Sequence, residues 1–220
     1  MKAVLFDFGG VITGPLDGMF AAVAAVSGAE PAELAAFLFG SYHSHAEAEN
    51  LWSRLECGEV PFTDLRRWAA DEGARRGWAL DLNHMVDYLG RIELRQPVLD
   101  RIGDLRRRGY LTAVVSNNFK EFDAYWRHRL DLDALFDAVV SSCEVGVRKP
   151  DARIYHLTLE RLGGIAPGDA VLLDDFEVNL AGARAAGLHG VLVGADTDAA
   201  LAELERLLEA DDDLRPTAVS

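Results

Sequence analysis

Asp7 directly follows a short apolar run and is soon followed by two glycines, a pattern that can support chemistry. The run at residues 3–6 is typical of a fully buried strand. Gly9 and Gly10 let the backbone turn sharply and approach a ligand closely. Open α/β sheets bind ligands at the carboxyl ends of their strands, so Asp7 is a candidate catalytic residue. Taken alone, Asp-x-Gly is also ordinary turn chemistry.

Polar side chains also end the later apolar runs. Ser116 and Asn117 could cap a helix or hold an oxyanion beside a helix N-terminus. Lys149 precedes a proline, which is equally compatible with a surface lysine before a helix. Asp174 and Asp175 are adjacent acids, which are costly at a strand end unless a cation lies between them. This acidic pair indicates a metal site.

Alternating strands and helices position these residues. We expect strands at 3–6, 111–115, 138–141, 170–173 and 191–193, and helices at 98–108, 120–130, 154–162, 180–186 and 199–210. Alternation with short loops predicts a parallel sheet covered on both faces, which is a doubly wound α/β fold. The all-apolar first strand suits a central position in that sheet.

Residues 15–92 differ from the rest because their apolar residues recur at helical spacing and no strand is evident. We interpret them as a helical cap inserted into an α/β core formed by 1–14 and 93–220. Trp52, Trp68 and Trp78 are expected in the cap core rather than at a substrate platform. Arg54 is more plausible on a solvated face than as an anion ligand.

Composition narrows the function. A net charge of −14 over 220 residues disfavours a nucleic-acid or anionic-membrane surface. No apolar stretch approaches the length of a membrane span, and residues 1–7 make a poor secretory signal. Cys57 and Cys143 stand in unrelated contexts, which fits a reducing compartment and predicts a cytoplasmic protein. Whether it is a monomer or a homodimer is not readable from the sequence.

The four polar clusters together resemble the motifs of the haloacid dehalogenase superfamily, whose members are mostly magnesium-dependent phosphatases. Asp7 matches the nucleophile of the first motif, Ser116 the second, Lys149 the third, and Asp174 with Asp175 the fourth. The segments 143–150, 173–175 and 196–198 look most like the branch that contains the N-terminal phosphatase domain of soluble epoxide hydrolase. Small bacterial sugar-phosphate phosphatases of similar layout lie near that branch.

The resemblance implies a Rossmann-like core with a helical cap, and hydrolysis of a small phosphorylated metabolite through an aspartyl-phosphate. Three carboxylates and one ammonium leave two net negative charges, which would repel a phosphate dianion unless Mg²⁺ binds first. The implied metal ligands are Asp7, the Gly9 carbonyl and Asp175. Asp174 either acts on the metal through a water molecule or orients Lys149. The implied substrate contacts are Ser116, the amide of Asn117, Gly10 and Lys149, and Asn179 could support the acidic pair.

One position departs from the family pattern. Most phosphatases of the superfamily carry a second Asp, a general acid, where this chain has Gly9. Losing a positioned acid typically costs about 10²–10⁴ in rate. The enzyme could favour leaving groups that need little protonation, such as anomeric sugar phosphates or acyl phosphates. A cap residue could substitute, with His43 and His45 as candidates in the polar stretch 41–50, or hydrolysis could be vestigial.

Two rival functions stay open. A 2-haloacid dehalogenase shares the fold and the Asp nucleophile but uses no metal, so the Asp174-Asp175 pair counts against it. A phosphate-binding domain without turnover would explain Gly9 but would not need Asp7. A P-loop nucleotidase is excluded because the chain contains no Gly-x-x-x-x-Gly-Lys-Ser/Thr.

Overall fold

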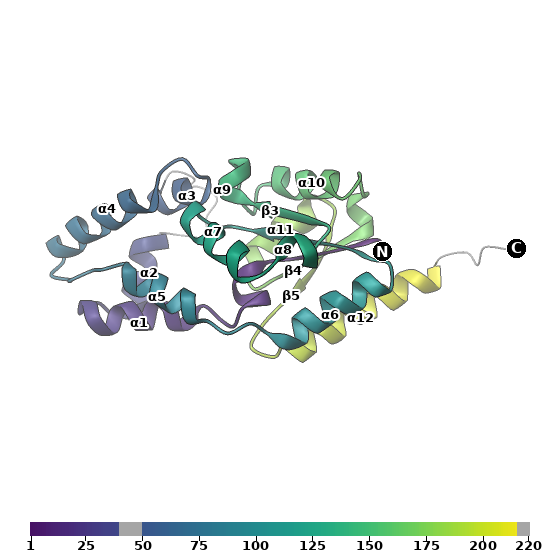
Figure 1. The fold of residues 1–220 in the computed structure, drawn as a ribbon, viewed down its shortest axis with the longest axis horizontal. Helices are drawn as coiled ribbons and strands as arrows, with labels where there is room; N and C mark the ends of the chain where they lie inside the picture. The colour runs from purple at the N-terminus through teal and green to yellow at the C-terminus, as the bar shows by residue number, and fades with distance from the viewer. Residues whose placement is uncertain (40–49, 215–220) are drawn as a thin grey trace, which may run out of the picture.

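A computed structural model describes residues 1–39 and 50–214 (Figure 1). The strands are β1 (Ala3–Phe6), β2 (Leu111–Ser116), β3 (Ala138–Ser141), β4 (Ala170–Asp174) and β5 (His189–Leu192). The helices are α1 (Asp17–Ser27), α2 (Pro31–Phe39), α3 (Leu51–Glu56), α4 (Phe62–Arg75), α5 (Asn83–Arg91), α6 (Gln96–Arg107), α7 (Lys120–Arg129), α8 (Leu132–Leu135), α9 (Ser142–Val145), α10 (Ala152–Arg161), α11 (Glu177–Ala185) and α12 (Thr197–Leu214). A π-helical turn, η1 (Phe8–Ile12), and a 3₁₀ turn, η3 (Pro167–Asp169), complete the described elements.

The five strands form one parallel sheet in the order β3-β2-β1-β4-β5. The first strand lies at its centre, as the sequence predicted, because β1 is apolar at every position and completely buried. β1 pairs with β2 on one side and with β4 on the other. The doubly wound α/β fold is therefore confirmed.

Alternate residues of the strands face two separate apolar layers. Val4 and Phe6 of β1 point into a layer formed mainly with α6 and α12, whereas Ala3 and Leu5 point into a layer formed with α10 and α11. Figure 1 shows these helix pairs on opposite sides of the sheet. Since both faces are covered, the carboxyl ends of the strands remain the place where polar side chains can gather.

Helices α1 to α5 form a helical layer beyond one end of the sheet (Figure 1). Their buried residues make a third apolar cluster, which Phe119 of the core joins. The two chain segments that lead into and out of this layer lie side by side, because Thr13 pairs with Leu94 and the Gly14 amide donates to the Glu93 carbonyl at 2.8 Å. The cap boundaries at 15 and 92 stay a prediction that this pairing supports.

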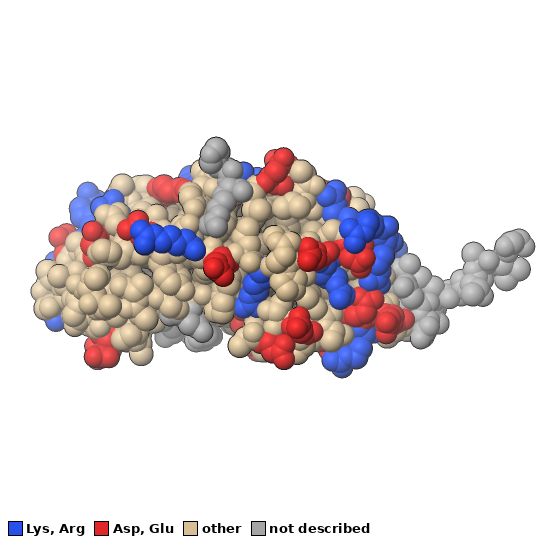
Figure 2. Space-filling view, turned by 60° about the horizontal axis from the view of Figure 1, so that its bottom comes forward, with Lys and Arg blue, Asp and Glu red and all other residues tan. Residues whose placement is uncertain are grey.

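Surface charge on the face drawn in Figure 2 is mixed over the core, with Lys and Arg interspersed with Asp and Glu, while the cap end is mostly uncharged. Within residues 1–39 and 50–214, no single helix is long and apolar enough to cross a bilayer. The pair 18–27 and 31–38 passes that test of length and composition together, with a 105° bend between the two helices.

Three details differ from the sequence prediction. Helices α8 and α9 were not predicted, because each is only four residues long and shows no periodicity. Strand β5 begins at His189, two residues earlier than predicted, whereas Gly9 and Gly10 form the non-helical turn that was expected after Asp7. The prediction that Trp68 belongs to the cap core is wrong: it is 37% exposed and stacks on Phe37, with the ring centroids 4.7 Å apart. The buried stripe of α4 consists of Phe62, Leu65, Ala69 and Gly73, and Trp68 lies beside it.

Two helical glycines provide a matched test of the packing beside the strand ends. A Cβ on Gly182 of α11 would lie 2.6 Å from Pro150 Cβ, whereas one on Gly103 of α6 would meet only Arg107 Nη1 at 3.5 Å. Alanine favours a helix over glycine by about 0.5–1 kcal/mol. We therefore expect Gly103→Ala to raise the unfolding free energy by about that amount and Gly182→Ala to lower it, as measured by urea denaturation. Equal stabilisation by both substitutions would contradict the close packing of α11 on the Pro150 loop.

Candidate active site

The sheet brings the predicted residues to one edge. Asp7 follows β1 directly, Ser116 ends β2 and Asp174 ends β4. Because β2 and β4 flank β1 in parallel, the three residues lie at the carboxyl ends of adjacent strands. The Asp7 amide donates to the Leu173 carbonyl at 2.9 Å, which extends the β1–β4 pairing into the site. The structure thus brings them together as the sequence predicted.

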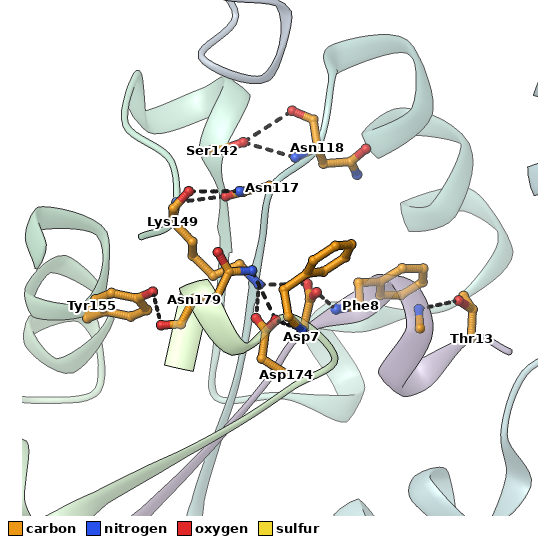
Figure 3. Close-up of polar contacts among 12 residues, drawn as sticks. Asp7, Phe8, Thr13, Asn117, Asn118, Ser142, Lys149, Tyr155, Asp174 and Asn179 are labelled. Carbon is orange, nitrogen blue, oxygen red and sulfur yellow. Dashed lines mark hydrogen bonds and ion pairs between the residues drawn. The ribbon is translucent and has the colours of Figure 1, made fainter. Parts of the chain in front are cut away.

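Lys149 is completely buried and lies between two carboxylates. Its Nζ is 2.9 Å from Asp7 Oδ1 and 2.6 Å from Asp174 Oδ2 (Figure 3). Burial lowers the pKa of the ammonium, but Asp174 and Asp7 more than offset this effect, so the pKa of Lys149 lies above its usual value. Lys149 is therefore a permanent positive charge at the base of the site.

Asn117 holds Lys149 through its backbone. Its Nδ2 donates to the Lys149 carbonyl at 3.0 Å, and its Oδ1 accepts from the Lys149 amide at 2.8 Å. The Asn118 amide donates to Ser142 Oγ at 2.9 Å (Figure 3). The Asn117 side chain is occupied by these bonds to the Lys149 backbone. The substrate contact predicted for the Asn117 backbone amide stays a prediction.

Asp174 is oriented on its other side by Asn179. Asp174 Oδ1 accepts from Asn179 Nδ2 at 2.9 Å and from the Phe176 amide at 2.9 Å. The Asn179 carbonyl in turn accepts from the buried Tyr155 hydroxyl at 2.7 Å. The prediction that Asn179 supports the acidic pair is confirmed. Asp174 also pairs with Lys149, which fits the prediction that it orients this lysine.

Asp175 completes a cluster of carboxylates with Asp7 and Asp174. One oxygen from each of the three lies within 4.8 Å of the other two. Asp175 Oδ1 is buried and has no hydrogen-bond partner. A buried carboxylate oxygen without a partner is costly, and a divalent cation would satisfy it. Hard oxygen donors of this kind fit Mg²⁺, so the residues present suit the ion that the sequence predicted.

The crowding of these carboxylates changes their acidity. Burial, and then the charges of Asp7 and Asp174, raise the pKa of Asp175 to about 8. Burial is also the largest effect at Asp7, where Lys149 opposes it and Asp174 adds to it, and the pKa of Asp7 is raised to about 6. These values describe the carboxylates with no cation between them.

The turn after Asp7 shapes the site through its glycines. Gly10 has φ +73°, and a Cβ there would lie 2.6 Å from Asp175 Cγ, so only glycine lets Asp175 approach. The Gly10 amide donates to Thr13 Oγ1 at 3.0 Å (Figure 3). This bond gives no support to the prediction that Gly10 binds substrate. Gly9 lines a cavity next to Asp7 and Asp175, and its carbonyl stays a predicted metal ligand.

A cavity of about 160 Å³ lies between the carboxylates and the helical layer. Its base is polar, with Asp7, Ser116 and Asp175, and its walls are mostly apolar. The apolar wall residues are Phe8, Leu16, Met19, Phe20, Trp52, Leu89, Ile92, Phe119, Phe122, Trp126 and Phe176. The cavity can therefore hold a small molecule with a polar end at the carboxylates and an apolar remainder.

Sequence reasoning missed Glu56, which lines this cavity and is 4% exposed. No motif marks it, although its position four residues after Trp52 in one helix was a usable signal. Trp52 is buried in the cap, as predicted, and also lines the cavity. Arg54 is exposed and paired with Glu59 at 3.1 Å, as expected of a solvated face. His43 and His45 lie outside the described residues.

Comparison with known proteins agrees with this geometry. A family model described as haloacid dehalogenase-like hydrolase matches residues 1–187. The chain is 33% identical over 168 residues to bifunctional epoxide hydrolase 2 of Sus scrofa, an alignment that covers 70% of this chain but only 30% of that protein. It is 28% identical over 206 residues to phosphoserine phosphatase of Thermus thermophilus, covering 87% of this chain and 81% of that protein.

Solved structures share the fold. A haloacid dehalogenase family enzyme of Bacteroides thetaiotaomicron, in complex with magnesium and inorganic phosphate, superimposes with a TM-score of 0.62. It is 18% identical, and the match covers 89% of this chain and 95% of that one. A dehalogenase also has this fold, so fold alone does not separate the two chemistries.

The raised pKa of Asp175 predicts how stability depends on pH. Between about pH 4 and 8 the folded protein keeps a proton that the unfolded chain, with a pKa of 3.8, has released. Folding stability in EDTA should therefore fall as pH rises through this window. Asp175→Asn removes the ionisation, and we expect its melting temperature at pH 8 to exceed that of the wild type by about 2–4 °C, the shift for roughly 1 kcal/mol at this size.

Asp174→Asn is the matched control, because it removes a partner of buried Lys149 and should lower the melting temperature at the same pH. A wild-type melting temperature that rises from pH 5 to pH 8 in EDTA would contradict the crowding of the three carboxylates.

Proposed function

Since the chain belongs to the haloacid dehalogenase-like hydrolase family, we propose that it is a Mg²⁺-dependent phosphatase that forms an aspartyl-phosphate on Asp7. The observation that carries the proposal is the convergence of Asp7, Asp174 and Asp175 on one small volume beside buried Lys149. The phosphatase among the relatives and the magnesium and phosphate complex among the solved structures support it.

Asp7, Asp175 and the Gly9 carbonyl would hold the metal, and Asp174 would act on it through water while it orients Lys149. When bound, Mg²⁺ supplies charge neutralisation at the carboxylates and polarisation of the phosphoryl oxygens. Asp175 Oδ1, which has no partner within the described chain, is the oxygen best placed to be a ligand.

Asp7 is prepared for attack by the contacts of one of its oxygens. Oδ1 accepts from the Phe8 amide at 2.7 Å and pairs with Lys149, so we assign the attack on phosphorus to Oδ2. Ser116 and the Asn117 backbone amide would hold the phosphoryl oxygens beside the positive charge of Lys149. The bond from phosphorus to the leaving oxygen breaks as the bond to Asp7 forms, and water then releases phosphate and restores Asp7.

The dehalogenase alternative accounts less well for the site. Its chemistry needs a nucleophilic Asp but no metal, and the buried, partnerless oxygen of Asp175 would then stay unexplained. A phosphate-binding domain without turnover would not need an Asp aimed into the cavity beside a buried lysine.

The metal requirement is the first test. We expect the purified protein to release phosphate from a panel of phosphorylated metabolites, including sugar 1-phosphates beside their 6-phosphate isomers, in Mg²⁺ but not in EDTA. Asp7→Asn should lower kcat by about 10³-fold or more while the protein stays folded. Halide release from 2-chloropropionate in EDTA would favour the dehalogenase, and phosphate binding without turnover would favour the binding domain.

The cavity also restricts the organic part of the substrate. Among the described residues that line it, Asp7, Glu56 and Asp175 are acidic and none is Lys or Arg. A second anionic group on the substrate would find no cation there and would lose its hydration among mostly apolar walls. The proposed substrate is therefore a phosphomonoester of an uncharged alcohol with an apolar body.

A matched pair of substrates tests this restriction. Phenyl phosphate should have a kcat/KM about tenfold or more above that of 4-carboxyphenyl phosphate, which corresponds to at least ~1.4 kcal/mol. The carboxyl group does not make the phenol a poorer leaving group. The difference in kcat/KM would therefore report how the cavity receives a second negative charge. Equal or preferred use of the carboxylated substrate, measured as phosphate release, would contradict the proposal.

A further inference from the structure

The leaving group of the proposed reaction would depart toward the cap. Attack by Asp7 is in line, so the bond that breaks points away from Asp7, from the ends of the strands into the cavity. Gly9 has no side chain that can protonate the leaving oxygen. A proton donor must therefore come from another residue that lines the cavity.

Glu56 reaches this cavity from the cap. It is the last residue of α3, in the helical layer, and it lines the same cavity as Asp7. No other Asp, Glu, His, Cys, Lys or Tyr of the described cap lines this cavity. Position and chemistry together single out Glu56 among the described residues.

The contacts of Glu56 hold its carboxyl group in one place. Oε1 accepts from Trp52 Nε1 at 2.8 Å. Oε2 is buried without a partner in hydrogen-bond geometry, although Arg148 Nε lies 2.7 Å away. The Glu56 carbonyl accepts from Ser142 Oγ at 2.6 Å, which fixes the end of α3 against the core. A donor held this firmly needs little reorganisation before proton transfer.

The surroundings of Glu56 favour its neutral form more than water does. Burial raises its pKa above the usual value, and this effect exceeds the opposing charges of Arg148 and Lys149. The Cys57 thiol, next along the chain, interacts electrostatically with Arg148 as well. A carboxyl group with a raised pKa is suited to give up a proton and take one back.

We propose that Glu56 is the general acid and base of this phosphatase, in the place of the side chain that Gly9 lacks. The proposal rests on the proposed phosphatase function. In the first step, the Glu56 proton passes to the leaving oxygen as the bond to phosphorus breaks and the Asp7–phosphorus bond forms. In the second, the Glu56 carboxylate takes a proton from water while the hydroxide oxygen bonds to phosphorus and the Asp7–phosphorus bond breaks. Inorganic phosphate leaves, and both carboxyl groups return to their first state.

Leaving-group dependence separates this role from a structural one. A nitrophenolate leaves without protonation, whereas an alkoxide does not. We expect Glu56→Gln to lower kcat/KM for hexyl phosphate by about 10²-fold or more and for p-nitrophenyl phosphate by less than about fivefold. Because the second step also needs Glu56, the variant should show a burst of nitrophenol followed by slow turnover. Glu59 is a nearby exposed glutamate, so Glu59→Gln is the matched control and should change kcat/KM for neither substrate.

Gly9 offers a rescue. A Cβ on Gly9 would approach only Leu16, with Cδ1 at 3.1 Å, and that flexible end can move. Gly9→Asp in the Glu56→Gln background should therefore raise kcat/KM for hexyl phosphate about tenfold or more above that of Glu56→Gln alone. A Glu56 that served only to hold Arg148 would not be replaced by an acid beside Asp7.

Several results would overturn the assignment: equal losses for both substrates, no loss for hexyl phosphate, or no rescue by Gly9→Asp in a folded protein. If Glu56→Gln does not fold, Glu56→Asp, which keeps the charge beside Arg148 but withdraws the carboxyl group, must lower the hexyl to nitrophenyl ratio or the assignment fails. A wild-type protein that releases no phosphate from either substrate in Mg²⁺ would instead sink the phosphatase function itself.

Discussion

The buried lysine at the ends of the strands is the contact on which the site depends. Lys149 is surrounded by protein and is stable there only because Asp7 and Asp174 lie within 2.9 Å and 2.6 Å of its ammonium. The same ammonium keeps Asp7 more acidic than burial alone would allow. Asn117 fixes the lysine backbone and Asn179 fixes Asp174, so each partner of the pair is itself held. The third acid, Asp175, has no such compensation within the described chain and is the natural place for a cation.

The core and the helical layer contribute different chemistry. The core supplies every charged group at the base of the cavity, because its parallel strands end side by side. Among its described residues, the helical layer supplies mostly apolar wall, with Met19, Trp52 and Leu89, and one acid, Glu56. Charge handling therefore resides in the sheet, whereas selection of the organic part of a substrate resides in the helices.

The sequence predicted the core well because its signals are local. The apolar run before Asp7 and the acids after Leu173 are each visible within a few residues, and parallel pairing then fixes their meeting place. Glu56 escaped prediction because its importance arises from contacts with Trp52 and with Arg148, which is distant in the chain. Trp68 was misplaced because an apolar residue directly before buried Ala69 is easily assigned to the same stripe of α4. The roles assigned to Gly9 and Gly10 depend on the direction in which each peptide group points, which two glycines in a sequence do not specify.

The bond between Ser142 Oγ and the Glu56 carbonyl has a mechanical consequence. The helical layer is joined to the core covalently at residues 14 and 93, which would act as a natural hinge. The end of α3 adds a third point of attachment, strengthened by the Lys120 ammonium, which donates to the Gly58 carbonyl at 3.1 Å. A swing of the whole layer would have to break these bonds on every catalytic cycle. The α3 edge of the helical layer is therefore held against the core while substrate and product exchange.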